Sequence, residues 1–184
     1  MIALQALVKS LCDDHALVDD HISLQLDGLN IVIRSNSRLL IKKLRHYFAH
    51  VLAGKIDNDE TTLEIIAIDR DVPETGLNFI DWTREPGKTG RKDAYIDLVD
   101  ARVILKVRTG MVFIQSQQYL LAVGPCVDND NQLINYINAQ YMNYLQQNGA
   151  LICHASALVR HDQCLAIAGF SGGGKSTLML QVLE

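Results

Sequence analysis

Hydrophobic and polar positions alternate in short runs near the start of the chain, and these runs predict a hairpin. Residues 3–12 are apolar at helical spacing and predict a short helix. The runs Ile22–Leu26 and Leu29–Ile33 alternate around Asp27-Gly28, a dipeptide that favours a two-residue turn. The chain is therefore expected to begin with a helix and two antiparallel strands.

A longer amphipathic helix is expected after this hairpin. Ser35 or Ser37 can cap its first turn, and Gly54 can end it after about Ala53. Apolar residues recur along the segment at the spacing of one helix face. The expected buried face consists of Leu40, Leu44, Tyr47, Phe48 and Val51.

The middle of the chain predicts a strand and, after a polar segment, an antiparallel meander over residues 95–123. Thr61–Asp69 alternates around branched apolar residues and is expected to be a strand. Further strands are expected at 95–99, at 102–108 and over 111–123, the last of them broken near its middle, and Thr109-Gly110 supplies a turn. Polar residues on one face of these strands indicate that this face meets water.

A second long helix is expected over 131–147. Asp128 or Asp130 can cap its start, and Asn148-Gly149 can end it. Its predicted packed face, at helical spacing, consists of Ile134, Ile137, Tyr141, Tyr144 and Leu145.

Composition and charge exclude several classes of protein. The 184 residues are 48% hydrophobic and 21% charged, with a formal net charge of −4, which argues against a disordered chain and against a general polyanion binder. The four cysteines lack metal-ligand spacing, and Lys9 interrupts the N-terminal apolar run, which argues against a signal peptide. We expect a cytoplasmic protein with no nucleic-acid or membrane partner, and the sequence is compatible with a homo-oligomer.

Residues 169–176 match the phosphate-loop pattern G-x-x-x-x-G-K-[ST] at every fixed position. An apolar strand is expected before the loop and a helix after it, the context that the pattern requires. Glycines let backbone N–H groups wrap a polyphosphate, and the helix N-terminus adds partial positive charge. Lys175 would reach the β- and γ-phosphates, and Ser176 would ligate Mg²⁺. The expected ATP-binding residues are Gly169, Phe170, Ser171, Gly172, Gly173, Gly174, Lys175, Ser176 and Thr177.

The segment before this loop predicts a hairpin that places a histidine near it. Ala150–Arg160 and Gln163–Ala168 alternate on either side of the turn His161-Asp162. If residues 160 and 163 pair, His154 lies opposite Gly169, within reach of a bound phosphate. A histidine there can hydrogen-bond a phosphate or transfer a proton, so His154 and Lys175 are the candidate catalytic residues.

The segment from Ile152 to Ser176 resembles the HPr kinase/phosphorylase family, and more narrowly the bacterial HPr-kinase-related proteins. The likeness consists of the strand with His154, of the phosphate loop, and of the 21 positions between His154 and Lys175. It implies a kinase domain of the HPr kinase/PEP carboxykinase-like type, in which this histidine and lysine are active-site residues, the loop binds ATP and Ser176 ligates magnesium. Thr177 stands where HPr kinases commonly carry Glu. The family's catalytic Asp and Mg²⁺-binding Glu would follow Glu184, so these 184 residues alone are expected to be inactive.

We therefore expect an α/β protein. Residues 1–125 should form a mixed α+β region with antiparallel strands, and residues 126–184 should begin a P-loop kinase domain. The expected function is transfer of the γ-phosphoryl group of MgATP to a hydroxyl of an unknown acceptor, a protein serine or a small molecule. Two alternatives stay open at this point: an ATP-binding-cassette ATPase, whose loops often read G-x-S-G-x-G-K-S-T-L, and a nucleotide-binding module without turnover.

Overall fold

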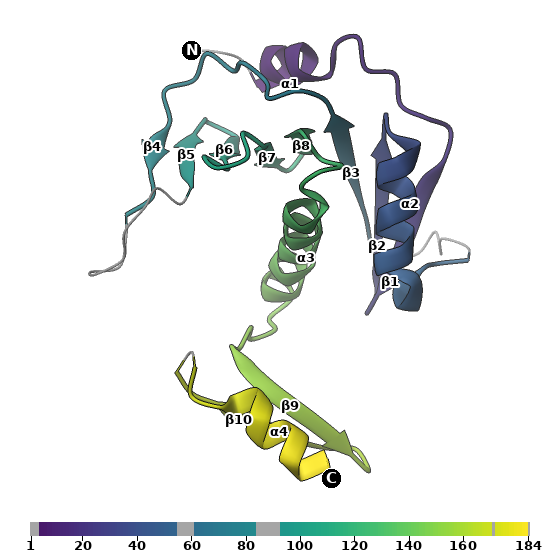
Figure 1. Ribbon diagram of the computed structural model, residues 1–184, viewed down its shortest axis with the longest axis vertical. Coiled ribbons are helices and arrows are strands. Elements are labelled where there is room, and N and C mark those ends of the chain that lie inside the picture. The colour runs from purple at the N-terminus through teal and green to yellow at the C-terminus, as the bar shows by residue number, and fades with distance from the viewer. Residues whose placement is uncertain (1–3, 55–60, 84–92, 171, 184) are drawn as a thin grey trace. The chain divides into compact units, whose positions relative to one another are not determined.

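A computed structural model of the protein describes residues 4–54, 61–83, 93–170 and 172–183 (Figure 1). Its contacts divide the chain into two compact units, Met1–Tyr141 and Met142–Glu184. The described residues form four α-helices, a mixed sheet of eight strands and a separate two-stranded hairpin. The protein is therefore of mixed α/β class, as expected.

The first unit holds the eight-stranded sheet. Its helices are α1 (Leu4–Cys12), α2 (Arg38–Tyr47) and α3 (Asp130–Gln147), which continues into the second unit; a short 3₁₀ turn, η1 (Ala49–Val51), follows α2. Its strands are β1 (His21–Leu26), β2 (Leu29–Ser35), β3 (Thr61–Asp69), β4 (Ile80–Asp81), β5 (Ala94–Asp97), β6 (Ala101–Leu105), β7 (Val112–Ser116) and β8 (Leu120–Gly124).

The strands of this sheet lie in the order β1-β2-β3-β8-β7-β6-β5-β4. The β1–β2 hairpin and the antiparallel meander from β5 to β8 are confirmed. The expectation of antiparallel pairing is wrong for β3, which runs parallel to both β2 and β8. The physical reason is α2: a helical crossover between β2 and β3 brings the chain back in the same direction.

Helices bury opposite faces of the sheet. Ile114 of β7 packs in one apolar cluster with Leu7 and Leu11 of α1. Its neighbour Phe113 points to the other face, because side chains alternate along a strand, and its ring stacks on Tyr136 of α3 at 4.7 Å between centroids. The Tyr136 hydroxyl also donates a 2.7 Å hydrogen bond to the Ile114 carbonyl. The core of the first unit therefore lies on both sides of the meander.

Helix α2 has the expected cap but ends early. The backbone N–H of Leu40 donates to Ser37 Oγ at 3.3 Å, so Ser37 is the N-cap. The helix was expected to reach about Ala53 and instead ends at Tyr47. The cause lies in β1: Ala53 N donates to the Ser23 carbonyl at 2.8 Å, which draws the chain onto the free edge of the sheet.

The packed face of each long helix differs in part from the expected one. In α2, Leu40, Leu44 and Phe48 are buried as expected, whereas Tyr47 is 52% exposed and Val51 is only half-buried. In α3, the expected Ile137 is buried, but the other buried residues are Leu133, Tyr136 and Gln140. The Tyr136 contacts with β7 rotate this face away from the one that the apolar pattern alone predicts.

The end of α3 is confirmed. Gly149 has a φ of +85°, its N–H donates to the Gln146 carbonyl, and the N–H of Ala150 donates to the Leu145 carbonyl. This pair of bonds closes the last helical turn, and the positive φ explains why a glycine stands there.

The side chain of Gln140 lowers the stability of the first unit, because its amide is buried without full hydrogen bonding. Gln140 is 4% exposed, and its Nε2 has no hydrogen-bond partner among the described residues. We expect Gln140→Met to raise the free energy of unfolding by about 1 kcal/mol, since a buried donor without a partner costs roughly 1–3 kcal/mol. Urea unfolding followed by circular dichroism measures this.

Gln132→Met in the same helix is the matched control for that substitution. Its Oε1 accepts a 3.0 Å hydrogen bond from Thr109 Oγ1, so its removal should leave stability unchanged or lower. A midpoint of Gln140→Met below that of the wild type would contradict the assignment.

The four cysteines should differ sharply in reactivity. Burial, with a smaller contribution from the Asp69 charge, raises the pKa of the Cys126 thiol to about 12. Cys12 is half-buried and its pKa is also raised, mainly by burial, whereas Cys153 and Cys164 are exposed.

Titration of the native protein with a disulfide reagent at pH 8 should therefore label Cys153 and Cys164 first, because the thiolate is the reactive form. Cys126 should react only after denaturant is added. Mass spectrometry of the labelled peptides identifies the order of reaction. Early labelling of Cys126 in the native protein would contradict the burial of its thiol.

Candidate functional site

The phosphate-loop pattern lies in the second unit, between a hairpin and a helix. The hairpin consists of β9 (Ala155–Arg160) and β10 (Gln163–Ala168), and α4 (Lys175–Leu183) follows the loop. Arg160 pairs with Gln163, and the register continues to Ala155 with Ala168. The hairpin register, the strand before the loop and the helix after it are present as expected, but the strand expected over Ala150–Arg160 begins only at Ala155, so His154 lies outside it.

His154 lies one position before the last pair of this hairpin. The register that joins Ala155 to Ala168 brings His154 and Gly169 next, immediately outside the strands. The alternation of β9, continued by one step, places His154 on the same face as Leu158, which is half-buried while Ala157 on the other face is exposed. The imidazole is exposed to solvent at the start of the loop.

The loop itself makes a tight turn that requires glycine. The N–H of Gly173 donates to the Phe170 carbonyl at 3.1 Å, and Gly172 has a φ of +80°. A Cβ on Gly173 would lie 3.0 Å from that carbonyl oxygen, at the limit of what side chains tolerate. These glycines let the backbone fold back on itself after β10.

The lysine of the pattern lies over this turn. Lys175 Nζ donates to the carbonyls of Gly169 at 3.1 Å and Phe170 at 3.0 Å. An ammonium group has three donors, so one stays available for an added acceptor. The sequence assigns Lys175 to phosphate, whereas its contacts with the loop carbonyls could not be predicted from the motif letters.

The first turn of α4 has no side-chain cap. The Gly174 carbonyl accepts the first helical bond, from Leu178 N at 2.9 Å, so the residue at the cap position has no side-chain acceptor. Among the residues that the structure describes, no hydrogen bond involves the N–H groups of Lys175, Ser176 or Thr177. Helix α2 differs, because Ser37 caps its first turn. In α4 the uncapped first turn presents a cluster of backbone donors that suits an anion.

The other expected binding residues surround this turn. Ser176 and Thr177 are exposed in the first turn of α4, and Phe170 is 94% exposed. Ser171 lies outside the described residues. The hydroxyl of Ser176 is a hard oxygen donor of the kind that Mg²⁺ prefers.

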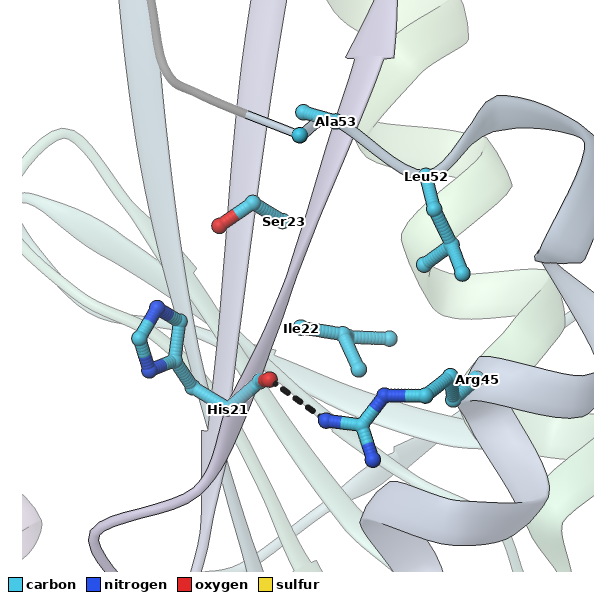
Figure 2. Close-up of a pocket in the computed structure, with 7 residues that line it drawn as sticks. His21, Ile22, Ser23, Arg45, Leu52 and Ala53 are labelled. Carbon is cyan, nitrogen blue, oxygen red and sulfur yellow. Dashed lines mark hydrogen bonds between the residues drawn. The ribbon is translucent and has the colours of Figure 1, made fainter.

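The first unit has a separate open pocket at the edge of the sheet (Figure 2). Its volume is about 590 Å³, and among the described residues that line it the Lys or Arg side chain is that of Arg45. Arg45 donates to the His21 carbonyl at 2.9 Å and forms a two-point ion pair with Asp20 at 2.7 and 3.2 Å. Because its charge is already paired, this pocket offers weaker anion recognition than the loop does.

The described part of the chain contains no group of three or more His, Cys, Asp or Glu side chains placed to hold a metal ion. None of its helices combines the length and the apolar character needed to cross a membrane.

Comparison with protein-family models, with curated proteins and with solved structures finds no match to this chain.

Proposed function

We propose that this chain supplies the MgATP site of an ATP-dependent phosphotransferase, through residues 169–177, for transfer of a phosphoryl group to a hydroxyl. The observation that carries the proposal is the uncapped first turn of α4 beside a glycine turn and Lys175. The resemblance of 152–176 to the HPr-kinase-related proteins supports a P-loop kinase fold of the HPr kinase/PEP carboxykinase-like type, located in the cytoplasm.

The backbone N–H groups of Lys175, Ser176 and Thr177, which have no hydrogen-bond partner among the described residues, would hold the polyphosphate together with the Lys175 side chain. The N-terminus of a helix carries roughly half a positive charge, and each exposed N–H there can donate to a phosphate oxygen. Lys175 adds a full charge and one free donor. Hydrogen bonds between charged partners are about twice as strong as neutral ones, so Lys175 is expected to be the largest single contributor to affinity.

Ser176 would hold the metal ion. Its hydroxyl is exposed at the second residue of α4, next to the amides that would hold the phosphates. Bound Mg²⁺ would neutralise part of the phosphate charge. The chain contributes this single hydroxyl, and water and phosphate oxygens would complete the ligand set.

His154 would act beside the transferred group. In the proposed reaction the acceptor oxygen forms a bond to the γ-phosphorus, the bond from this phosphorus to the β–γ bridging oxygen breaks, and ADP leaves. The acceptor, a protein serine or a small-molecule hydroxyl, loses its proton to a base. His154, exposed at the start of the loop, would hold a hydrogen bond or a proton at the phosphate.

Lys175→Ala should weaken ATP binding by at least 10-fold, since a hydrogen bond to a charged group contributes roughly 1.5–3 kcal/mol. Titration of a fluorescent ATP analogue in the presence of Mg²⁺ measures this affinity. Lys9→Ala, an exposed lysine of α1 with the same charge change, is the control and should bind as the wild type does. Equal affinity of both variants would contradict the assignment of the loop.

Transfer chemistry is tested separately from binding. With γ-labelled ATP, the full-length protein should pass the label to an acceptor in a bacterial lysate, and His154→Ala should lower this transfer without changing ATP affinity. Release of the label only as free phosphate would contradict a kinase and favour an ATPase. Normal transfer by His154→Ala would show that this histidine has only a structural role.

A further inference from the structure

Helix α2 carries an unusual concentration of positive charge for this protein. Its ten residues, Arg-Leu-Leu-Ile-Lys-Lys-Leu-Arg-His-Tyr, include four Lys or Arg and no acidic residue, whereas the whole chain has a formal net charge of −4. A local excess of this kind on an acidic protein creates a local positive potential.

The helix geometry separates these charges into two groups. Leu40, Ile41 and Leu44 are buried against the sheet. With 3.6 residues per turn, the side opposite them presents Leu39, Lys42 and His46, with Arg38 at its edge. We call these four residues the α2 ridge, and all four are exposed.

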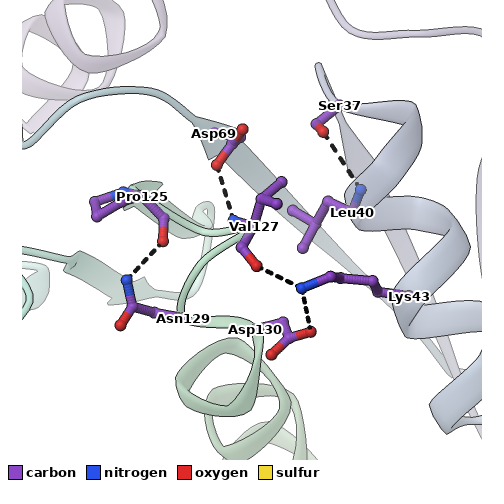
Figure 3. A network of polar contacts seen from close by, with 8 residues as sticks. All are labelled: Ser37, Leu40, Lys43, Asp69, Pro125, Val127, Asn129 and Asp130. Atoms are coloured by element: carbon purple, nitrogen blue, oxygen red, sulfur yellow. Dashed lines mark hydrogen bonds and ion pairs between the residues drawn. The ribbon is translucent and has the colours of Figure 1, made fainter.

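The two cations that flank the ridge, Lys43 and Arg45, are paired with acidic groups of the first unit. Lys43 donates to the Val127 carbonyl at 2.8 Å and pairs with Asp130 at 3.1 Å (Figure 3). Arg45 reaches the opposite way, where it pairs with Asp20. It also bonds the His21 carbonyl at the edge of β1, as Figure 2 shows. Both side chains therefore lean away from the ridge and brace the helix.

The two cations on the ridge have no such role. Neither the side chain of Arg38 nor that of Lys42 takes part in a hydrogen bond or ion pair among the described residues. They lie one helical turn apart, so their charges are close enough to act on one ligand. Beside them, Leu39 is 54% exposed, which adds apolar surface to the charge.

We infer that the α2 ridge is a docking surface for an acidic segment of a partner protein. Charge complementarity selects an acidic ligand, because the side chains of Arg38 and Lys42 have no ion-pair partner among the described residues, whereas the whole chain carries a net negative charge. The exposed Leu39 selects a polypeptide over a nucleic-acid backbone, because apolar side chains of a protein segment can cover it. This inference is independent of the function proposed for residues 169–177.

The test is a binding measurement with a defined probe. A fluorescein-labelled amphipathic peptide of Glu and Leu is titrated against the protein by fluorescence anisotropy at low and at physiological salt. Arg38→Glu/Lys42→Glu should weaken binding by about 10-fold, because two attractive contacts become repulsive. Leu39→Ser should weaken it by about 3-fold with every charge kept.

The matched control is Lys9→Glu/Arg108→Glu, which changes the net charge by the same amount at two exposed positions outside α2. It should bind the peptide within about 3-fold of the wild type. Circular dichroism checks that each variant is folded, and Arg38→Gln/Lys42→Gln replaces the double reversal if that variant unfolds.

Three results would overturn the inference. The first is equal weakening by the two double variants, which would mean that net charge alone attracts the peptide. The second is unchanged binding by the ridge variants. The third is binding of single-stranded DNA as tight as that of the peptide, with this binding lost in the same variants. That result would make the ridge a nucleic-acid surface.

Discussion

Asp69 holds the ends of three parallel strands together, and the positions of two helices depend on it. Its backbone N–H and carbonyl bond the side-chain amide of Asn36 at 2.8 and 2.9 Å, just after β2. Its carboxylate accepts the N–H of Val127 at 2.8 Å, just after β8. Helices α2 and α3 begin within a few residues of these contacts. Lys43 of α2 connects the two helices, because it donates to the Val127 carbonyl and pairs with Asp130 of α3. The polar ends of β2, β3 and β8 therefore set where both helices cross the sheet.

Much of the local structure could be predicted, because short-range chemistry decides it. Asp27-Gly28 specifies the first hairpin, Ser37 caps α2, and Gly149 ends α3. The place of β3 could not be predicted, because its alternation fits a parallel and an antiparallel neighbour equally well. Its partners follow from the helical crossover and from the Asn36–Asp69 contact, both of which join residues far apart in the sequence.

The candidate site could be predicted in outline for a similar reason. The motif letters require a strand, a glycine turn and a helix, and the register of β9 with β10 follows from a two-residue turn. What sequence reasoning missed depends on atoms that the letters do not specify. The Lys175 ammonium lies on two loop carbonyls, and the first turn of α4 lacks a cap because Gly174 has no side chain. The glycine at position 174 was the only available signal for the second of these features.

Helices α2 and α4 present positive charge in different ways, and the difference underlies the two different ligands that we propose for them. In α4 the charge lies at the helix end, in converging backbone donors with a lysine beside them, and a compact group such as a phosphate can reach all of them at once. In α2 the end is occupied by Ser37, which satisfies the Leu40 amide, so the remaining charge lies along the side of the helix on Arg38 and Lys42. A compact phosphate would contact only one of those two side chains closely. An extended acidic segment can contact both and cover Leu39. The two proposed surfaces therefore differ in their donors: that of α4 depends on the backbone N–H groups that follow Gly174, and that of α2 depends on the side chains of Arg38 and Lys42.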